Sequence, residues 1–250
     1  FLSPNDELEN LMNETKSNFQ EFYNSEKLEI LAMFEELPEG FHKQEGLKYL
    51  VRRIDGQEHP DPTYKPAAAI AWTGLKTTEF MSKAFIGGNL SDTRRLILHE
   101  KAHFLWEYTF DDTTKEDWTE LGGWFEDPTS ASGWSTYNTT EFVSAYAHAK
   151  NPNEDMAESI AIYLTNPDRL INVSMVKYEF IRDRIMHGTR YVAQIREDLG
   201  MSTVAFLVKF CGDSLAARHE SGRFLDKAHL STWAVNVRHH PELAHVALND

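Results

Sequence analysis

The most informative stretch of the chain is residues 94–106, RRLILHEKAHFLW. Its apolar residues recur at helical spacing and predict a central helix over about residues 92–108. His99 and His103 stand four residues apart, so on a helix they lie about 40° apart around the axis and one turn apart along it. Both imidazoles can therefore bind one metal ion, with Glu100 held close to the ion without binding it.

The H-E-x-x-H spacing is that of zinc metalloproteases, in which the glutamate is the general base for a metal-bound water. A chance match is expected only roughly 0.05 times in a chain of this composition. The alternative is two histidines satisfied by hydrogen bonds inside the core. The apolar setting favours the metal, because unpaired imidazoles would be costly there.

A catalytic zinc ion needs a third protein ligand and an open position for water. Trp106 and Thr109 stand where a longer H-E-x-x-H-x-x-G-x-x-H motif would have glycine and histidine, so the third ligand is expected to be a carboxylate from another helix. The best source is NPNEDMAES, residues 151–159, in which Glu154 and Glu158 are four residues apart. One can bind the metal while the other supports a ligating histidine. A capping role for Glu154 at the start of this helix remains the alternative.

The rest of the chain predicts one α+β domain over residues 1–250, with a short sheet over the H-E-x-x-H helix and a helix-rich C-terminal half. Residues 27–36 fit helix or strand. A long acidic loop is predicted over residues 111–140, in which Trp118, Trp124 and Trp134 either line a cleft or pin the loop. The other expected elements are helices at 5–24, 44–54, 151–165 and 168–187, and strands at 67–73 and 83–86.

Composition narrows the class of partner. The 25 Lys+Arg against 39 Asp+Glu give a net charge of -14, which argues against nucleic acid and against a polybasic hold on lipid. No apolar run is long enough for a membrane span.

The single cysteine, Cys211, excludes a disulfide within the chain and is expected to be a buried hydrophobe. A chain that begins at Phe1 suggests a piece of a longer protein, and four Asn-x-Ser/Thr sequons hint weakly at secretion; they begin at Asn13, Asn89, Asn138 and Asn172.

HEKAH at residues 99–103, followed by FVSAYAHAKNPNEDMAES at residues 142–159, resembles the anthrax lethal factor and Pro-Pro endopeptidase group of gluzincin metallopeptidases. The resemblance covers about residues 66–187, and residues 188–250 match nothing in that group. It implies a zincin-like fold in which His99, His103 and Glu154 bind one zinc ion. It further implies that Glu100 is the base, that Tyr146 stabilises the oxyanion and that Glu158 supports a ligand.

These observations predict a secreted zinc endopeptidase that acts on a protein or peptide substrate. Two alternatives stay open. One is an inactive binding module of the same fold, in which residues 111–140 or the last 60 residues fill the cleft. The other is a zinc hydrolase that does not act on peptides.

Overall fold

The structure is a computed structural model that describes residues 1–37, 41, 44–86 and 90–187. Its contacts divide the chain into two compact units. The unit of Phe1–Tyr23 and Gln44–Ile181 contains the sheet and every predicted site residue.

The other unit comprises Asn24–Lys43 and Arg182–Asp250. Its described helix is α2 (Asn24–Glu36), so residues 27–36 are helical rather than extended. The unassigned extension, residues 188–250 with Cys211, lies outside the described residues. A single domain over residues 1–250 therefore stays a prediction.

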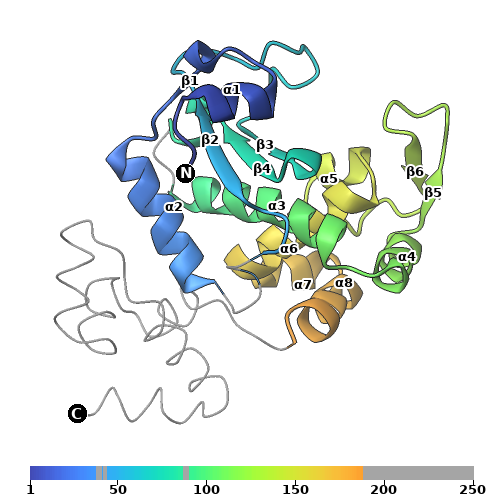
Figure 1. Ribbon diagram of the computed structural model, residues 1–250. Helices are drawn as coiled ribbons and strands as arrows, with labels where there is room; N and C mark the ends of the chain where they lie inside the picture. The colour runs from blue at the N-terminus through green and yellow to red at the C-terminus, as the bar shows by residue number, and fades with distance from the viewer. Residues whose placement is uncertain (38–40, 42–43, 87–89, 188–250) are drawn as a thin grey trace, which may run out of the picture. The chain divides into compact units, whose positions relative to one another are not determined.

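A four-stranded sheet forms one layer of the unit that holds the site (Figure 1), with strand order β1-β2-β4-β3. β2 and β4 run parallel, whereas β1 pairs with β2, and β3 with β4, in antiparallel fashion. β3 confirms the predicted strand within residues 67–73, and among the described strands it pairs only with β4. The strands are β1 (Phe19–Gln20), β2 (Tyr49–Arg53), β3 (Ala69–Trp72) and β4 (Thr77–Phe80).

The helix predicted at residues 44–54 is wrong, because this segment contains strand β2. Its charged end resembles the polar face of a helix in sequence, yet Arg52 and Arg53 are both buried. The Arg53 Nε donates to Glu79 at 2.6 Å, and Arg52 donates to Asp55 at 2.7 Å. These ion pairs allow two arginines to occupy a buried strand.

The strand predicted at residues 83–86 is also wrong, because a 3-10 turn (Ser82–Ala84) occupies that place and the strand β4 precedes it. β4 reads Thr-Thr-Glu-Phe, which is too polar to suggest a buried strand, although all four residues are buried. The carboxylate of Glu79 is satisfied from both sides, by Arg53 and by the Trp72 Nε1, which donates at 2.8 Å. A second 3-10 turn (Thr73–Leu75) joins β3 to β4.

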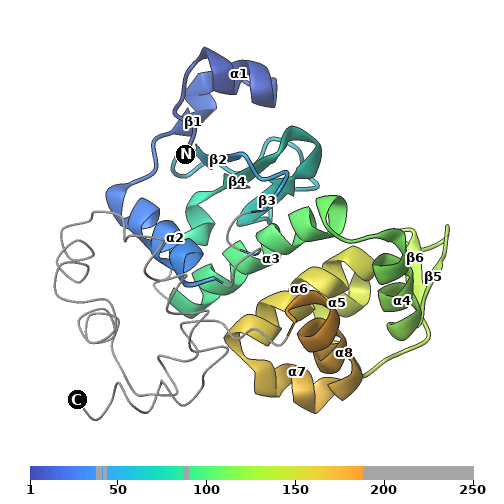
Figure 2. The ribbon, with the colours of Figure 1, turned by 60° about the horizontal axis from the view of Figure 1, so that its bottom comes forward.

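The predicted central helix is α3 (Leu90–Tyr108), and it begins two residues earlier than expected. Figure 2 shows α3 between the sheet and α6 (Pro152–Thr165). Ile97, Leu98 and Phe104 are buried, which explains the apolar character of the sequence around most of the helix. The predicted helix at residues 151–165 is confirmed as α6, with Pro152 in its first turn.

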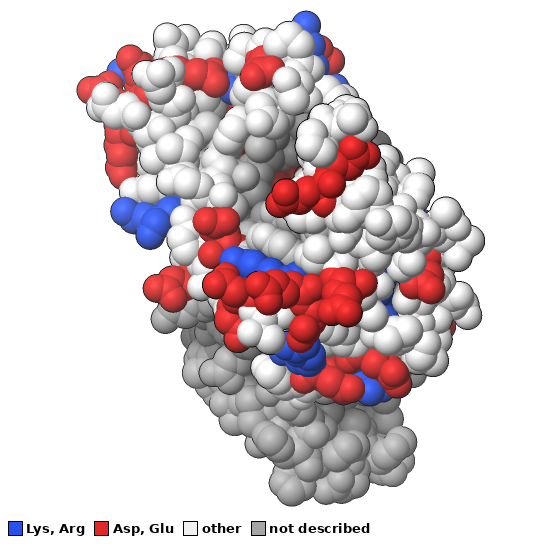
Figure 3. Space-filling model, turned by 90° about the vertical axis from the view of Figure 1, so that its right-hand side faces the viewer, with Lys and Arg blue, Asp and Glu red and all other residues white. Residues whose placement is uncertain are grey.

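The loop predicted at residues 111–140 is wrong, because most of this segment is regular structure. Asp111 caps its helix by accepting a hydrogen bond from the Thr114 N–H at 2.8 Å. Trp118 and Trp124 are buried and pin the segment, and Trp134 is half-buried. Figure 3 shows the side of the molecule that carries these elements, on which acidic side chains gather. The elements are α4 (Asp112–Leu121), β5 (Trp124–Glu126) and β6 (Trp134–Thr136).

Two other predicted helices are shorter than expected. The helix predicted at residues 5–24 ends where Asn13 takes a left-handed conformation, and a 3-10 turn and β1 follow. The helix predicted at residues 168–187 is broken at Ser174, whose hydroxyl caps the next helix. The described part of the C-terminal half, up to residue 187, is nevertheless helix-rich, and the α+β class is confirmed. The remaining elements are α1 (Asp6–Met12), a 3-10 turn (Lys16–Asn18), α5 (Ala145–Ala149), α7 (Pro167–Val173), α8 (Met175–Phe180) and a π-helical turn (Ile181–Ile185).

Across the described residues, no helix combines the length and the apolar character that a membrane crossing requires.

Candidate metal centre

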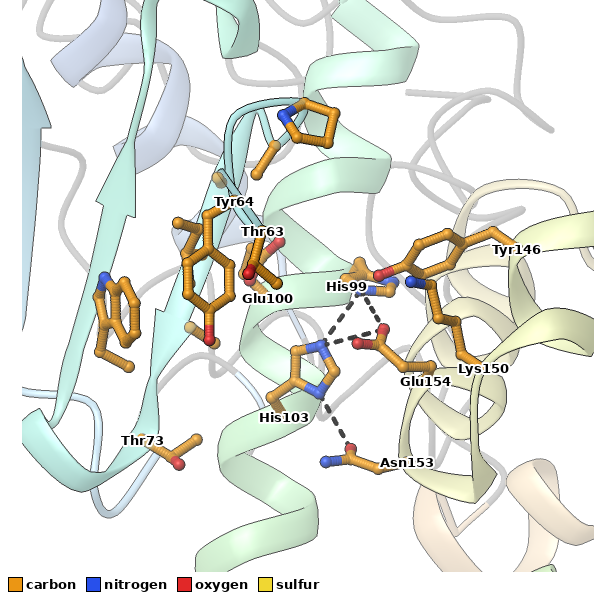
Figure 4. Close-up of a pocket in the computed structure, with 16 residues that line it drawn as sticks. Thr63, Tyr64, Thr73, His99, Glu100, His103, Tyr146, Lys150, Asn153 and Glu154 are labelled. Atoms are coloured by element: carbon orange, nitrogen blue, oxygen red, sulfur yellow. Dashed lines mark hydrogen bonds and ion pairs between the residues drawn. The ribbon is translucent and has the colours of Figure 1, made fainter. Parts of the chain in front are cut away.

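Helices α3 and α6 bring together three side chains that could hold a metal ion, namely His99, His103 and Glu154. Three of their atoms form a triangle (Figure 4). The Nε2 atoms of His99 and His103 are 3.2 Å apart, and the Oε2 of Glu154 lies 3.1 Å from the first and 3.5 Å from the second.

These separations fit one tetrahedral zinc ion. Ligand atoms that are each 2.0–2.2 Å from a shared zinc ion lie about 3.3–3.5 Å apart at the tetrahedral angle. The Glu154 Oε2 is buried and makes no hydrogen bond of good geometry, although both histidine nitrogens are close to it. A buried carboxylate oxygen this close to two imidazole nitrogens requires a positive charge beside it, which either a protonated His99 or a bound cation supplies.

The side chain of Glu154 lies at the candidate ligand position, while its helix is capped by another residue. The side chain of Asn151 accepts a hydrogen bond from the Glu154 backbone N–H at 3.0 Å and so caps α6. The carboxylate of Glu154 lies against the two histidines. Asn151 therefore makes the capping bond, and the Glu154 side chain is available to a metal.

Glu158, the carboxylate predicted from the sequence to support a ligand, lies behind His99. Its Oε1 is 3.0 Å from the Nδ1 of His99, and that nitrogen has no better-aligned acceptor. The carboxylate is fixed from two further directions, since Arg95 donates at 3.0 Å and the Ser144 hydroxyl at 2.7 Å. A carboxylate at Nδ1 orients the ring and directs Nε2 to the metal position.

Asn153 plays the matching part for His103, and this role was not predicted from the sequence. Its Oδ1 lies 2.9 Å from the Nδ1 of His103. Because an amide oxygen only accepts hydrogen bonds, Nδ1 carries the proton and Nε2 is left with a free lone pair. An asparagine in the first turn of a helix is common and does not by itself indicate a function. The role of Asn153 depends on its contact with His103, which lies on another helix.

The two histidines are electrostatically distinct. Burial alone would lower the pKa of His99, but its contacts with Glu154 and Glu158 raise that pKa to about 10. Burial and the charge on His99 together lower the pKa of His103 to about 4. The carboxylates thus attract one positive charge to this place, and a divalent cation would displace the His99 proton, since metal ligands must be deprotonated.

Glu100 is buried beside the group with a pKa suited to proton transfer. Burial raises the pKa of Glu100 to about 7, although the charge of His99 acts in the opposite direction. A general base works best with a pKa near the operating pH.

A cavity of about 720 Å³ opens beside the three ligand residues. One wall is β3 with the loop before it, including Tyr64, and the opposite wall carries Tyr146 and Lys150 (Figure 4). The Tyr146 ring centroid is 6.1 Å from that of His99, and burial together with Glu154 raises the pKa of its hydroxyl, so the hydroxyl stays protonated. No residue of the predicted 111–140 loop is among those that line the cavity, so that described segment does not fill it.

A buried ion pair lies behind the metal group, which is formed by His99, His103 and Glu154. This pair was not predicted from the sequence. Asp155 and Lys177 are fully buried, and the Lys177 ammonium lies 2.9 and 2.8 Å from the two carboxylate oxygens. The same ammonium donates to the Glu141 carbonyl oxygen at 2.8 Å, and the Trp124 indole donates to Asp155 at 3.2 Å. This network joins the N-terminal turn of α6, which carries the ligand position, to α8 and to β5.

No protein-family model, curated protein or solved structure matches the chain. A function for the protein is therefore inferred from the geometry of the site and from the sequence.

Proposed function

We propose that the protein is a zinc-dependent endopeptidase with a zincin-like fold. The observation that carries this proposal is the triangle of His99, His103 and Glu154 at tetrahedral ligand spacing, with buried Glu100 next to it. The donor set of two imidazoles and one carboxylate is that of catalytic zinc sites with three protein ligands.

Bound to these three residues, zinc would supply Lewis acidity and lower the pKa of a water molecule. Glu100 would take a proton from a water molecule as the water oxygen bonds to the scissile carbonyl carbon, and would deliver that proton to the amine nitrogen as the C–N bond breaks. The Tyr146 hydroxyl stands on the cavity wall, protonated, and donates a hydrogen bond to the oxyanion that develops on the scissile carbonyl. Glu158 and Asn153 keep the two ligating rings in place.

The outer edge of β3, which pairs with no other described strand, favours a peptide over other substrates. Ala69, Ile70, Ala71 and Trp72 line the cavity, and the outer edge of this strand is unpaired among the described strands. An extended peptide can add to such an edge through main-chain hydrogen bonds, which small esters and amides cannot do. Peptide hydrolysis is therefore proposed ahead of other zinc hydrolysis. Secretion belongs to the same proposal.

The proposal is tested by measuring metal and activity together. Protein purified without chelator or His-tag should contain about one zinc ion per chain by plasma mass spectrometry, and His103→Ala should contain little. The zinc-loaded protein should cleave members of a random peptide library, as read by mass spectrometry. A chelator should abolish the cleavage, and so should Glu100→Gln with its zinc retained.

A protein without zinc would refute the metal assignment. A protein that holds zinc but cleaves no peptide would refute the endopeptidase and leave the two alternatives. Cleavage of ester or amide compounds under the same conditions would then identify a different zinc hydrolase, and no cleavage of either class would identify a binding module.

A further inference from the structure

The cavity beside the metal group has one feature that the proposed reaction does not use. Lys150 is the only lysine or arginine among the described residues that line it. The acidic residues of the lining, Glu100 and Glu154, are both engaged with the metal group. No ion pair joins Lys150 to a carboxylate in the part of the chain that the structure describes.

The backbone holds Lys150 in a defined place. It directly follows α5, which the Ser144 hydroxyl caps by accepting from the Ala147 N–H at 3.0 Å. It directly precedes Asn151, the residue that caps α6. The backbone of Lys150 thus lies between Ser144 and Asn151, the two residues that cap these helices. The Lys150 ammonium lies 5.2 Å from the centroid of the Tyr146 ring (Figure 4).

A cation in this position is significant because the molecule is strongly acidic. The net charge of -14 disfavours the approach of another anion, and acidic side chains gather on the face shown in Figure 3. An unpaired ammonium on a cavity wall offers a local partner for a carboxylate, and such charge-assisted hydrogen bonds are stronger than neutral ones.

We propose that Lys150 binds a carboxylate of the substrate beside the metal group, so that the protein selects peptides with an acidic group near the scissile bond. The inference rests on the proposed peptidase function. The carboxylate can be an Asp or Glu side chain or the C-terminal carboxylate of the peptide, and the chemistry of recognition is the same.

A purely structural role for Lys150 makes a different prediction. If the ammonium only holds the Tyr146 ring by a cation–π contact, its loss should lower kcat equally for all peptides. If it binds a substrate carboxylate, its loss should raise KM for peptides that carry the carboxylate and leave neutral peptides unchanged.

Four peptide libraries separate these cases and identify the source of the carboxylate. One pair contains Asp and Glu and the other replaces them by Asn and Gln, and each is made as free acid and as C-terminal amide. Lys150→Met should raise KM about ten-fold for the library type that the wild-type protein prefers, Lys150→Arg should retain the preference, and Lys150→Glu should abolish it. A preference that follows the side-chain acid identifies an internal residue, and one that follows the free C-terminus identifies the terminal carboxylate.

Lys76→Met is the matched control, because the Lys76 ammonium lies 5.6 Å from the centroid of the Tyr108 ring and does not line the cavity. It should leave the preference unchanged. Equal KM values for all four libraries in the wild-type protein would overturn the inference, and so would a preference that survives in Lys150→Glu.

A binding measurement keeps this result separate from the fate of the peptidase proposal. Calorimetric titration of zinc-loaded Glu100→Gln with the same libraries reports affinity without turnover. Affinity for acidic libraries that falls about ten-fold with the added Lys150→Met change supports the inference even if no peptide is cleaved. Cleavage without any such difference in affinity supports the peptidase and overturns the role of Lys150.

Discussion

Replacing Lys177 by methionine should destabilise the protein by about 3–5 kcal/mol, the usual cost of removing one partner of a buried ion pair. The structure explains why this site should reach that range. Both side chains are fully buried, and the ammonium contacts both oxygens of Asp155 as well as the Glu141 carbonyl. The variant leaves a buried carboxylate with little more than the Trp124 indole at 3.2 Å.

Thermal unfolding at pH 7 should show this cost as a fall in Tm of about 6–20 °C, because 1 kcal/mol corresponds to roughly 2–4 °C in a chain of this size. The deficit should shrink as the pH is lowered. Burial already raises the pKa of Asp155 against the effect of Lys177, and without the lysine the folded-state pKa rises further above its unfolded value of 3.8. In the variant, protonated Asp155 therefore contributes stability below that unfolded value. This contribution is lost as the pH rises through the folded-state pKa of Asp155.

Two further variants make this prediction refutable. Lys83→Met breaks an ion pair with Glu58 whose side chains are 47% and 53% exposed, so it should cost at most about 1 kcal/mol. Combining Lys177→Met with Asp155→Asn should recover most of the lost stability, because no buried charge remains. If Lys177→Met costs no more than Lys83→Met, or if the double variant is no better than the single one, the buried pair does not contribute as argued.

The remaining predictions concern the metal group. Glu154→Ala should strip zinc outright, whereas Glu158→Ala should weaken zinc binding about ten- to a hundredfold; normal zinc content in Glu154→Ala, measured beside its thermal melt, would disprove the ligand assignment. Tyr146→Phe should lower turnover about 10²-fold with little change in zinc affinity, and an unchanged kcat would remove Tyr146 from the mechanism. In chelator-treated protein, the pKa of Glu100, raised by burial from 4.5 to about 7, stabilises the fold below pH 4.5 and stops doing so as the pH rises through 7. The Tm of wild type relative to Glu100→Gln should therefore fall between pH 4.5 and 8, and a constant difference would contradict a buried Glu100.

The candidate site was predictable to the extent that its geometry is local. His99, Glu100 and His103 lie on one helix, so their spacing in sequence fixes their mutual placement before any tertiary contact forms. Glu154 and Glu158 were recognisable as a pair for the same reason. Their spacing alone could not rank them, because both lie on one face of α6, and only the family resemblance placed Glu154 first. In the structure, the approach of α3 brings Glu154 to the two Nε2 atoms and Glu158 to the Nδ1 of His99.

Prediction failed where a residue's partner is distant in sequence. Arg53 and Glu79 are polar in sequence, and their ion pair across the sheet lets both side chains be buried in β2 and β4. The segment 111–140 resembled a loop because its tryptophans gain their roles from partners such as Asp155.

The sequence by itself determined that two imidazoles and a carboxylate share one helical turn, that a second helix offers two further acids, and that the chain is strongly acidic. Tertiary structure brought Glu154 beside the two Nε2 atoms, placed Asn153 behind His103 and Ser144 behind Glu158, and set Lys150 on the cavity wall. The division has a physical reason. Helical periodicity fixes neighbours within about four residues, whereas contacts such as that of Lys177 with Asp155 form only when separate helices pack and exclude water.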